Sequence, residues 1–177
     1  MLAFASVCEI AIREARSNEF DDVAALLALA YAEYAPDRGS ERRSDWDEYF
    51  NDVTDVRGRV EDGSILIVAE QDGRLAGTAT FYPSRCASSG GDWPAGWAAI
   101  RLVAVLPDAR GRGVGSALTE HCLGRARREG APTVGLHTSN MMTTALALYE
   151  RLGFVREPEH DHNISTDLVV MRFRLDL

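Results

Sequence analysis

An apolar strand, a glycine-rich turn and a helix follow one another over residues 97–130, and this unit constrains the fold more than any other part of the chain. Residues 97–106 are almost continuously apolar and stop at Pro107, which predicts a buried strand. Glycines then alternate with other residues over 111–115, so the backbone there can curl tightly. A helix is expected over residues 113–130, with its last glycine as a natural C-terminal cap. A buried strand joined to a crossover helix indicates a sheet with helices packed against it.

Hairpin connections accompany this crossover, so the sheet is expected to be mixed rather than wholly parallel. Residues 64–70 and 75–82 predict a hairpin around an Asp-Gly turn at 71–74. Periodicity places the other strands at residues 9–13, 97–106, 133–138, 154–155 and 168–175, and the helices at about 18–36, 44–60, 113–130 and 141–152. A chain of 177 residues with this pattern is expected to form one mixed α/β domain, 1–177.

The glycine turn, Arg110-Gly-Arg-Gly-Val-Gly-Ser116, predicts an anion site. Its backbone N–H groups can form a concave nest, and the first turn of the helix adds unpaired N–H groups and the positive end of the helix dipole. Such a turn binds phosphate or pyrophosphate. A Walker A loop is excluded because the chain contains no lysine, and a dinucleotide-binding fingerprint is disfavoured because the third glycine comes one residue early.

The charge distribution agrees with an anion site at this turn. The chain has a formal net charge of −8, which argues against binding nucleic acid or an anionic membrane through its overall field. Residues 101–128, however, carry six arginines against two acidic side chains, whereas residues 9–62 carry fifteen acidic and seven basic ones. The sequence therefore contains one basic segment, at the place where a polyanion would dock.

Several other classes of protein are disfavoured by the sequence. It has no uninterrupted apolar run of about 18 residues and no basic residue before its apolar start, so neither a membrane span nor a secretory signal is expected. Cys8, Cys86 and Cys122 lack a CxxC spacing, which suits a reducing cytoplasm and argues against a disulfide framework or a structural zinc site. The His-Asp-His run at 160–162 is interpreted as a polar loop, and no metal is expected.

Two motifs together resemble the GNAT superfamily of acyl-CoA-dependent N-acyltransferases. Arg110, Gly113 and Gly115 match the Arg/Gln-x-x-Gly-x-Gly/Ala signature, and residues 148–154, Leu-Tyr-Glu-Arg-Leu-Gly-Phe, look like the family's Tyr-Glu-x-Leu-Gly-Phe block. The resemblance implies a mostly antiparallel sheet flanked by about four helices. It also implies that the sheet splays between the strands at 97–106 and 133–138, with the pantetheine arm of acetyl-CoA in the gap.

The resemblance also implies which residues act on the cofactor. Backbone groups of the strand would pair with pantetheine, and those of the turn would hold the pyrophosphate. The expected cofactor-binding residues are Val103, Val105, Arg110, Gly111, Arg112, Gly113, Val114, Gly115, Ser116 and Asn140. Asn140 is included because Met142 stands where the family usually has an asparagine, so that a neighbouring amide would have to substitute.

The expected catalytic acid is Tyr149, which would protonate the departing CoA thiolate. The general base stays open: the strand before the turn offers no glutamate, and Glu70, His137 or ordered water are the candidates.

The resemblance predicts transfer of an acetyl group from acetyl-CoA to a primary amine of a small molecule or protein, by direct attack in a ternary complex. The acidic segment at 9–62 would attract a cationic amine, whereas Tyr31, Tyr34, Trp46, Tyr82 and Trp93 could frame a more apolar one. O-acetylation, transfer of a longer acyl chain and a non-catalytic acyl-CoA-binding regulatory module are the alternatives. A cytoplasmic location and no metal are expected, and a homodimer stays open.

Overall fold

The computed structural model describes residues 9–86 and 91–177, and Cys8 lies outside these ranges. Its sheet runs in the order β1-β2-β3-β4-β5-β8-β6, with β7 paired to β8, and every neighbouring pair is antiparallel except β4 and β5. The strands are β1 (Ile10–Glu14), β2 (Ile65–Gln71), β3 (Arg74–Tyr82), β4 (Ala98–Val105), β5 (Thr133–Ser139), β6 (Val155–Arg156), β7 (His162–Asn163) and β8 (Val169–Asp176). The expectation of a mixed, mostly antiparallel sheet is confirmed.

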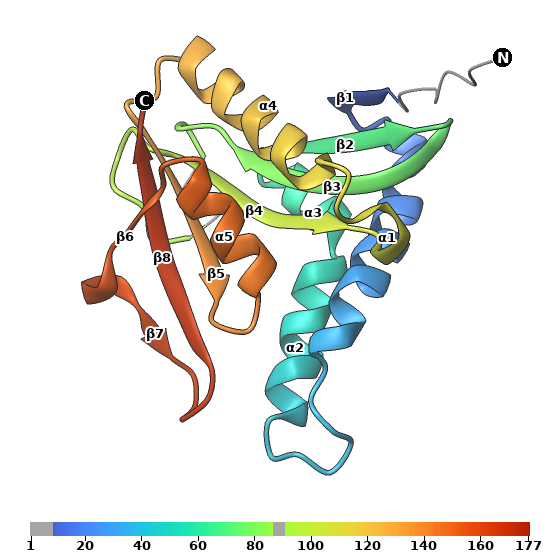
Figure 1. Cartoon of the computed structure of the whole chain (residues 1–177), viewed down its shortest axis with the longest axis vertical. Helices are drawn as coiled ribbons and strands as arrows, with labels where there is room; N and C mark the ends of the chain where they lie inside the picture. Colours follow the sequence, from blue (N-terminus) through green and yellow to red (C-terminus); the bar gives the residue numbers. More distant parts are fainter. Residues whose placement is uncertain (1–8, 87–90) are drawn as a thin grey trace, which may run out of the picture.

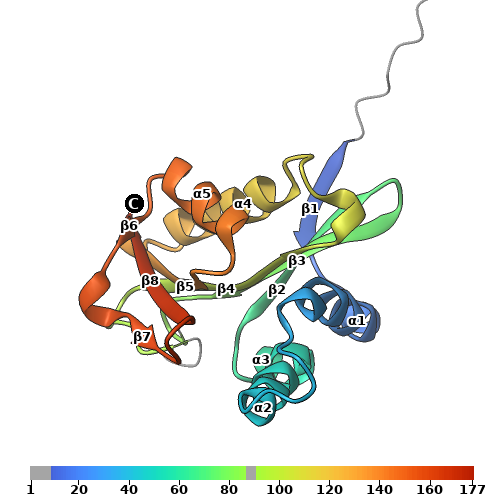
Figure 2. The ribbon, with the colours of Figure 1, turned by 60° about the horizontal axis from the view of Figure 1, so that its bottom comes forward.

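Helices cover both faces of the sheet, as Figures 1 and 2 show. They are α1 (Phe20–Tyr31), α2 (Arg43–Thr54), α3 (Val56–Glu61), α4 (Val114–Arg128) and α5 (Thr143–Arg151). α4 and α5 pack on one face over a core that includes Ile67, Phe81 and Leu118. α1, α2 and α3 pack on the other face over a second core that includes Val23 and Val53. None of the helices in the described ranges is long and apolar enough to cross a membrane.

The helix expected over residues 44–60 is two helices, so the described residues contain five α-helices rather than about four. Asp55 interrupts the helical path with ψ 72° and caps α3, because its Oδ1 accepts a hydrogen bond from the Gly58 N–H at 2.9 Å. A side-chain acceptor that satisfies the first N–H groups of a helix favours a new start at that point. The periodicity of the apolar residues carries no signal for this break.

β4 and β5 part after three paired residues, and this opens the sheet. Their parallel register runs only from Ala98↔Val134 to Ile100↔Leu136. On its other side β4 carries a bulge, since Thr80 of β3 pairs with Arg101 whereas Thr78 pairs with Ala104. Leu102, within the bulge, has a φ of +54°, which is rare for a residue with a side chain. The bulge bends β4 away from β5, as bulges generally bend the strand that contains them.

Candidate functional site

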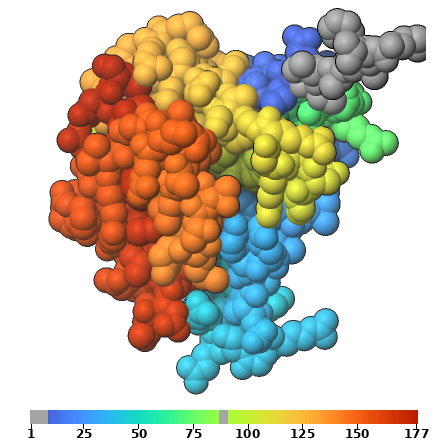
Figure 3. Space-filling view, viewed as in Figure 1, coloured from blue at the N-terminus to red at the C-terminus, as the bar shows by residue number. Residues whose placement is uncertain are grey.

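A cavity of about 640 Å³ lies where β4 leaves β5. It is bounded by the end of β4, the glycine turn, one side of α5 along its whole length and the end of α1. In Figure 3 the turn (yellow) and α5 (orange) lie on the same face of the molecule, with α1 and α2 (blue) below them. Its lining includes many residues expected from the sequence to bind cofactor: Val103, Val105, Arg110, Gly111, Gly113, Val114, Gly115 and Ser116.

The edge of β4 that faces this cavity has no partner strand beyond Ile100 in the described part of the chain. Val103 and Val105 lie on this free edge and line the cavity. Backbone N–H and C=O groups on such an edge can pair with the amides of an extended ligand, as they would with another strand. Val105 already uses its carbonyl oxygen, which accepts a hydrogen bond from Arg110 Nε at 3.2 Å. The free edge is therefore suited to an amide-bearing chain such as pantetheine.

The glycine turn contains residues with positive φ, a conformation that is common for glycine and rare for residues with a side chain. Gly111 and Gly113 have φ values of 75° and 84°, and Gly113 is the N-cap of α4. A Cβ at either position would meet no heavy atom within 4 Å, so the space above the turn is open. No side chain caps the start of α4, which leaves its first N–H groups available to an anion. This geometry fits the pyrophosphate of a CoA-type cofactor.

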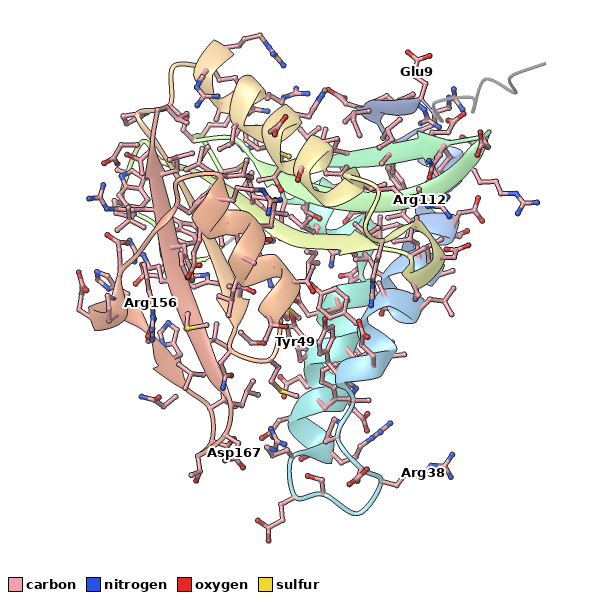
Figure 4. All side chains as sticks on the ribbon, in the orientation of Figure 1. Glu9, Arg38, Tyr49, Arg112, Arg156 and Asp167 are labelled. Atoms are coloured by element: carbon pink, nitrogen blue, oxygen red, sulfur yellow. The ribbon has the colours of Figure 1, made fainter. Side chains whose placement is uncertain are left out.

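Three arginines surround the turn in different ways. Arg110 forms an ion pair with Glu33, just beyond α1, and is thereby held in place. Arg112, labelled in Figure 4, has no ion pair or hydrogen bond to the rest of the described chain. Arg151 of α5 lines the cavity and donates from Nη2 to Ser116 Oγ at 3.3 Å. The sequence does not indicate Arg151, because no spacing along the chain places the end of α5 beside the start of α4.

The basic segment is less uniform than its charge count indicates. Arg125 of α4 forms ion pairs with Glu14 and Glu129 and therefore lies away from the turn, against β1. The structure directs Arg110 and Arg112 to the turn and uses Arg125 to hold α4 on the sheet.

Tyr149 lies in the wall of the cavity and is 5% exposed. Its ring packs edge-on against Phe154, with 5.6 Å between the ring centroids. Its hydroxyl makes no hydrogen bond to any described residue. Burial, with a smaller contribution from Cys122, raises the pKa of Tyr149 well above its ordinary value, so the phenol is protonated at neutral pH. A buried, protonated and unpaired hydroxyl at the cavity wall is suited to donate a proton to a bound group.

Aromatic side chains from α1 and the turn after it form the opposite wall. Tyr31 and Tyr34 line the cavity with their ring centroids 6.2 Å apart, and Tyr49 of α2 lies 6.3 Å from Tyr31. Met142, at the start of α5, also lines the cavity at the position where the family resemblance expects an asparagine. The walls away from the turn are therefore mainly apolar.

The structure does not bring the base candidate Glu70 to this cavity. Its carboxylate pairs with Arg13 at 2.7 Å, and Arg13 also pairs with Glu19 at 2.7 Å. These three residues line a separate cavity of about 470 Å³ between α1 and the β2–β3 turn.

The other base candidate, His137, lies on the sheet face that α1–α3 cover. Its ring is 4.5 Å from that of Trp93, centroid to centroid. Burial, followed by the charges of His162 and Arg172, lowers the pKa of His137 to about 4, so the ring is neutral at neutral pH. No carboxylate or histidine lines the cavity among the described residues.

Asn140, expected to bind the cofactor, instead lies outside the cavity and joins two strands. Its Nδ2 donates to the carbonyl oxygen of Asp167 at 2.9 Å, and its Oδ1 accepts from the N–H of Val169 at 3.0 Å. Both ends of the amide are thus occupied in joining β5 to β8, and the residue does not line the cavity.

The His-Asp-His run at 160–162 also has a structural contact, because Asp161 forms an ion pair with Arg156. The described residues contain no group of three or more potential metal ligands.

Part of the acidic segment at 9–62 is paired with arginines. Its carboxylates form ion pairs with arginines of the segment itself, of β4 and of the glycine turn: Glu19–Arg13, Asp21–Arg57, Glu33–Arg110, Asp47–Arg43 and Asp52–Arg101. The negative field expected from the sequence to attract a cationic amine is reduced accordingly.

Comparison with known proteins agrees with this geometry. Residues 21–154 match the Acetyltransferase (GNAT) family. Curated relatives include the mycothiol acetyltransferases of Clavibacter sepedonicus, 31% identical over 82% of this chain and 42% of that protein, and of Streptomyces griseus subsp. griseus, 32% identical over 75% and 39%. The chain thus spans about two fifths of the length of these relatives.

Solved structures share the fold at lower sequence identity. The yncA protein of Salmonella typhimurium, solved with its cofactor acetyl-CoA, is 20% identical with a TM-score of 0.64, covering 96% of this chain and 94% of that one. A ribosomal-protein-alanine N-acetyltransferase from Brucella melitensis is also 20% identical, with a TM-score of 0.65 and coverages of 94% and 99%.

Proposed function

This chain belongs to the GNAT acetyltransferase family, and we propose that it transfers the acetyl group of acetyl-CoA to a primary amine of a small molecule or protein. The observation that carries the proposal is the cavity itself. It places the free edge of β4, the N-terminal end of α4 and the unpaired hydroxyl of Tyr149 around one space.

Acetyl-CoA would supply the activated thioester. The turn from Gly111 to Ser116 would bind its pyrophosphate through backbone N–H groups, with Arg112 and Arg151 adding positive charge. Val103 and Val105 would hold the pantetheine amides along the free edge of β4. The Val103 N–H, next to the bulge at Leu102, would polarise the thioester carbonyl.

The amine would attack this carbonyl directly in a ternary complex. A carbon–nitrogen bond forms as the carbon–sulfur bond breaks, and Tyr149 protonates the departing thiolate. Cys122 is buried close to Tyr149, and burial raises the pKa of its thiol to about 12, so it does not act as an acyl-accepting nucleophile.

The general base is the open part of this mechanism. Glu70 is paired with Arg13 in a separate cavity, and His137, although neutral, does not line the cavity that Tyr149 lines. Ordered water is therefore the remaining candidate. We therefore propose that an ordered water relays the proton from the ammonium group.

One observation favours a second function, a non-catalytic acyl-CoA-binding module. The described lining of the cavity contains no carboxylate or imidazole that could act as a base. Both functions require the same cofactor site, so both predict binding of acetyl-CoA. Only the transferase also predicts release of CoA in the presence of an amine.

Release of CoA thiol with a panel of primary amines separates the two functions, with thermal unfolding in acetyl-CoA as a parallel measurement. Turnover above background with at least one amine is the expected result. If acetyl-CoA raises the melting temperature but no amine releases CoA, the transferase proposal fails and the binding module is supported.

A further inference from the structure

A polar cluster lies on the face of the sheet that α1–α3 cover. Figure 2 shows that these helices and the glycine turn lie on opposite sides of the sheet. We call it the Arg101 cluster; its members are Asp52, Arg59, Thr80, Tyr82 and Arg101. Thr80 and Arg101 are partners in the β3–β4 register, so their side chains lie on the same face. Arg101 Nη2 donates to Asp52 Oδ2 of α2 at 3.0 Å. The cluster thus joins β3, β4 and the α2–α3 pair.

The cluster contains several buried polar groups without a hydrogen-bond partner. The Tyr82 hydroxyl and Thr80 Oγ1 are buried without a hydrogen-bond partner in the described chain, on residues that are at most 1% exposed. Nε of Arg59, a residue 4% exposed, also lacks a partner. All three groups can donate a hydrogen, and each costs free energy while it is buried and unpaired.

Arg101 adds further unused donors. A guanidinium carries five N–H groups, and the bond to Asp52 uses one of them. The side chain of Arg101 is 26% exposed and that of Asp52 is 49% exposed, so a ligand from solvent can reach the pair. Burial raises the pKa of Tyr82, whereas the charges of Arg101 and Arg59 and hydrogen bonding with Arg101 oppose this rise.

The charge of the cluster is positive. Arg59 donates to the carbonyl oxygens of Asp52 and Val53, so its charge stabilises the C-terminal end of α2. Asp52 is the carboxylate that pairs with Arg101. The carboxylate of Asp55 also acts on Arg59, so the attraction for an added anion is local to the remaining N–H groups of Arg101.

The bulge in β4 connects this cluster to the proposed point of transfer. The bulge interrupts the alternation of side chains along β4, so the side chains of Arg101 and Leu102 both lie on the α1–α3 side. The next residue, Val103, lines the cavity. Two residues of a strand span about 7 Å. The Arg101 guanidinium extends away from β4 toward Asp52, so a ligand held there would need a chain of several atoms to reach the carbonyl bound at Val103.

We infer that Arg101 determines acceptor specificity by binding an anionic group, in the first place a carboxylate, on the same small molecule that carries the amine. The inference rests on the proposed function and narrows its acceptor to amino acids and related amines with a carboxylate a few atoms from the nitrogen. The amine faces Val103, while the carboxylate accepts hydrogen bonds from Arg101 beside Asp52. The phosphates of CoA do not compete, because the glycine turn that would bind them is on the other side of the sheet (Figure 2).

Matched pairs of amines test this inference. Tryptophan with tryptamine and histidine with histamine differ only in the carboxylate, and an aminoalkylphosphonate tests whether a phosphonate can replace it. The expected result is a higher kcat/KM for the carboxylated member of each pair. In Arg101→Gln this preference is lost through a rise in KM of about tenfold to a hundredfold, because a charge-assisted hydrogen bond is removed.

Variants separate binding from a loss of structure. Arg101→Lys keeps the charge and is expected to keep most of the preference. Asp52→Asn removes the same ion pair but leaves the Arg101 guanidinium in place. This variant should therefore retain the preference for carboxylated amines, even if it is as unstable as Arg101→Gln. Arg57→Gln, which removes an exposed pair with Asp21, is the control for a changed surface charge.

Each outcome decides the inference. If turnover shows no carboxylate preference, favours the decarboxylated amines, or is unchanged in Arg101→Gln, the inference is overturned. If no amine turns over, the proposed function fails separately, and the melting temperature in CoA is then compared with and without each amine. If the carboxylated amines raise the melting temperature of the wild type but not of Arg101→Gln, an anion site at Arg101 is supported. If they do not raise the melting temperature of the wild type, the inference is overturned.

Discussion

Arg110 and Glu33 form a bidentate ion pair that ties the turn before α4 to the segment after α1, with Nη2–Oε1 at 2.6 Å and Nη1–Oε2 at 3.1 Å. The pair lowers the pKa of the Glu33 carboxyl, and its two residues are 77 positions apart in the sequence. Arg110, the first residue of the signature, therefore has a positioning role in addition to its charge.

A double-mutant cycle tests this positioning role. Both side chains are more than a third exposed, so the coupling free energy between Arg110→Gln and Glu33→Gln is expected to be about 0.2–1 kcal/mol by urea unfolding. Arg112→Gln, which breaks no contact in the described chain, should leave the free energy of unfolding unchanged and raise the Kd for acetyl-CoA about tenfold. Zero coupling within error would contradict the positioning role.

Tyr149→Phe is expected to lower the rate of acetyl transfer without destabilising the fold. Loss of a general acid should lower kcat by at least about a hundredfold, whereas the Kd for acetyl-CoA should stay the same. The hydroxyl is unpaired, so its removal should not lower the melting temperature. A variant with a lower melting temperature and normal kcat would instead assign Tyr149 to the core.

Gly113→Ala should weaken cofactor binding through backbone strain. At a φ of 84° an alanine costs about 1–2 kcal/mol, although its Cβ meets no neighbouring atom. Relief of this strain would rotate the first N–H groups of α4 away from the phosphates, and the Kd for acetyl-CoA should rise. Gly39→Ala is the matched control, since a Cβ there also meets open space but φ is ordinary. Equal effects of the two substitutions on binding would contradict the assignment of the turn.

Gly77→Ala should push α4 away from β3. Its Cβ would lie 2.8 Å from the Ala104 carbonyl oxygen and 2.9 Å from Cγ1 of Val114, the first residue of α4. Overpacking of this kind costs about 1–3 kcal/mol, and the shift of the helix should also raise the Kd for acetyl-CoA.

Gly124→Ala, in the same helix, is the control for Gly77→Ala. Its nearest contact is the flexible end of Arg128 at 3.4 Å, so the gain in helix propensity should stabilise the chain by about 0.5–1 kcal/mol. Chemical denaturation and calorimetric titration with acetyl-CoA measure both effects. Unchanged affinity in a destabilised Gly77→Ala variant would show that the position of α4 does not control the site.

Glu19 should contribute a pH-dependent part of the stability. Hydrogen bonds from Arg13, and then from the Arg16 N–H, lower its pKa from 4.5 to about 2. Because the folded pKa is the lower one, the stabilisation is complete above about 4.5 and is lost as the pH falls toward about 2. Urea unfolding across this range should show a steeper loss for the wild type than for Glu19→Gln. Glu41→Gln, at an exposed carboxylate with no ion pair in the described chain, should follow the wild type.

The sequence by itself determined the order of the elements and the centre of the site. Alternating glycines at 111–115 predict a tightly curled turn, and in the structure Gly111 and Gly113 have positive φ values. The Tyr-Glu-Arg-Leu-Gly-Phe block indicates Tyr149, and it lines the cavity. These features depend on conformations and spacings within one short segment, which is why they can be read along the chain.

Only the tertiary structure decided which distant groups meet at the site. The separation of β4 from β5 depends on a bulge at Leu102, a residue type that carries no signal for a positive φ. Strand register places Glu70 in another cavity, and helix packing brings Arg151 to Ser116 and Asp52 to Arg101. Such contacts depend on how whole elements pack against one another, because a change of one residue in register or of one turn in packing would bring different side chains together.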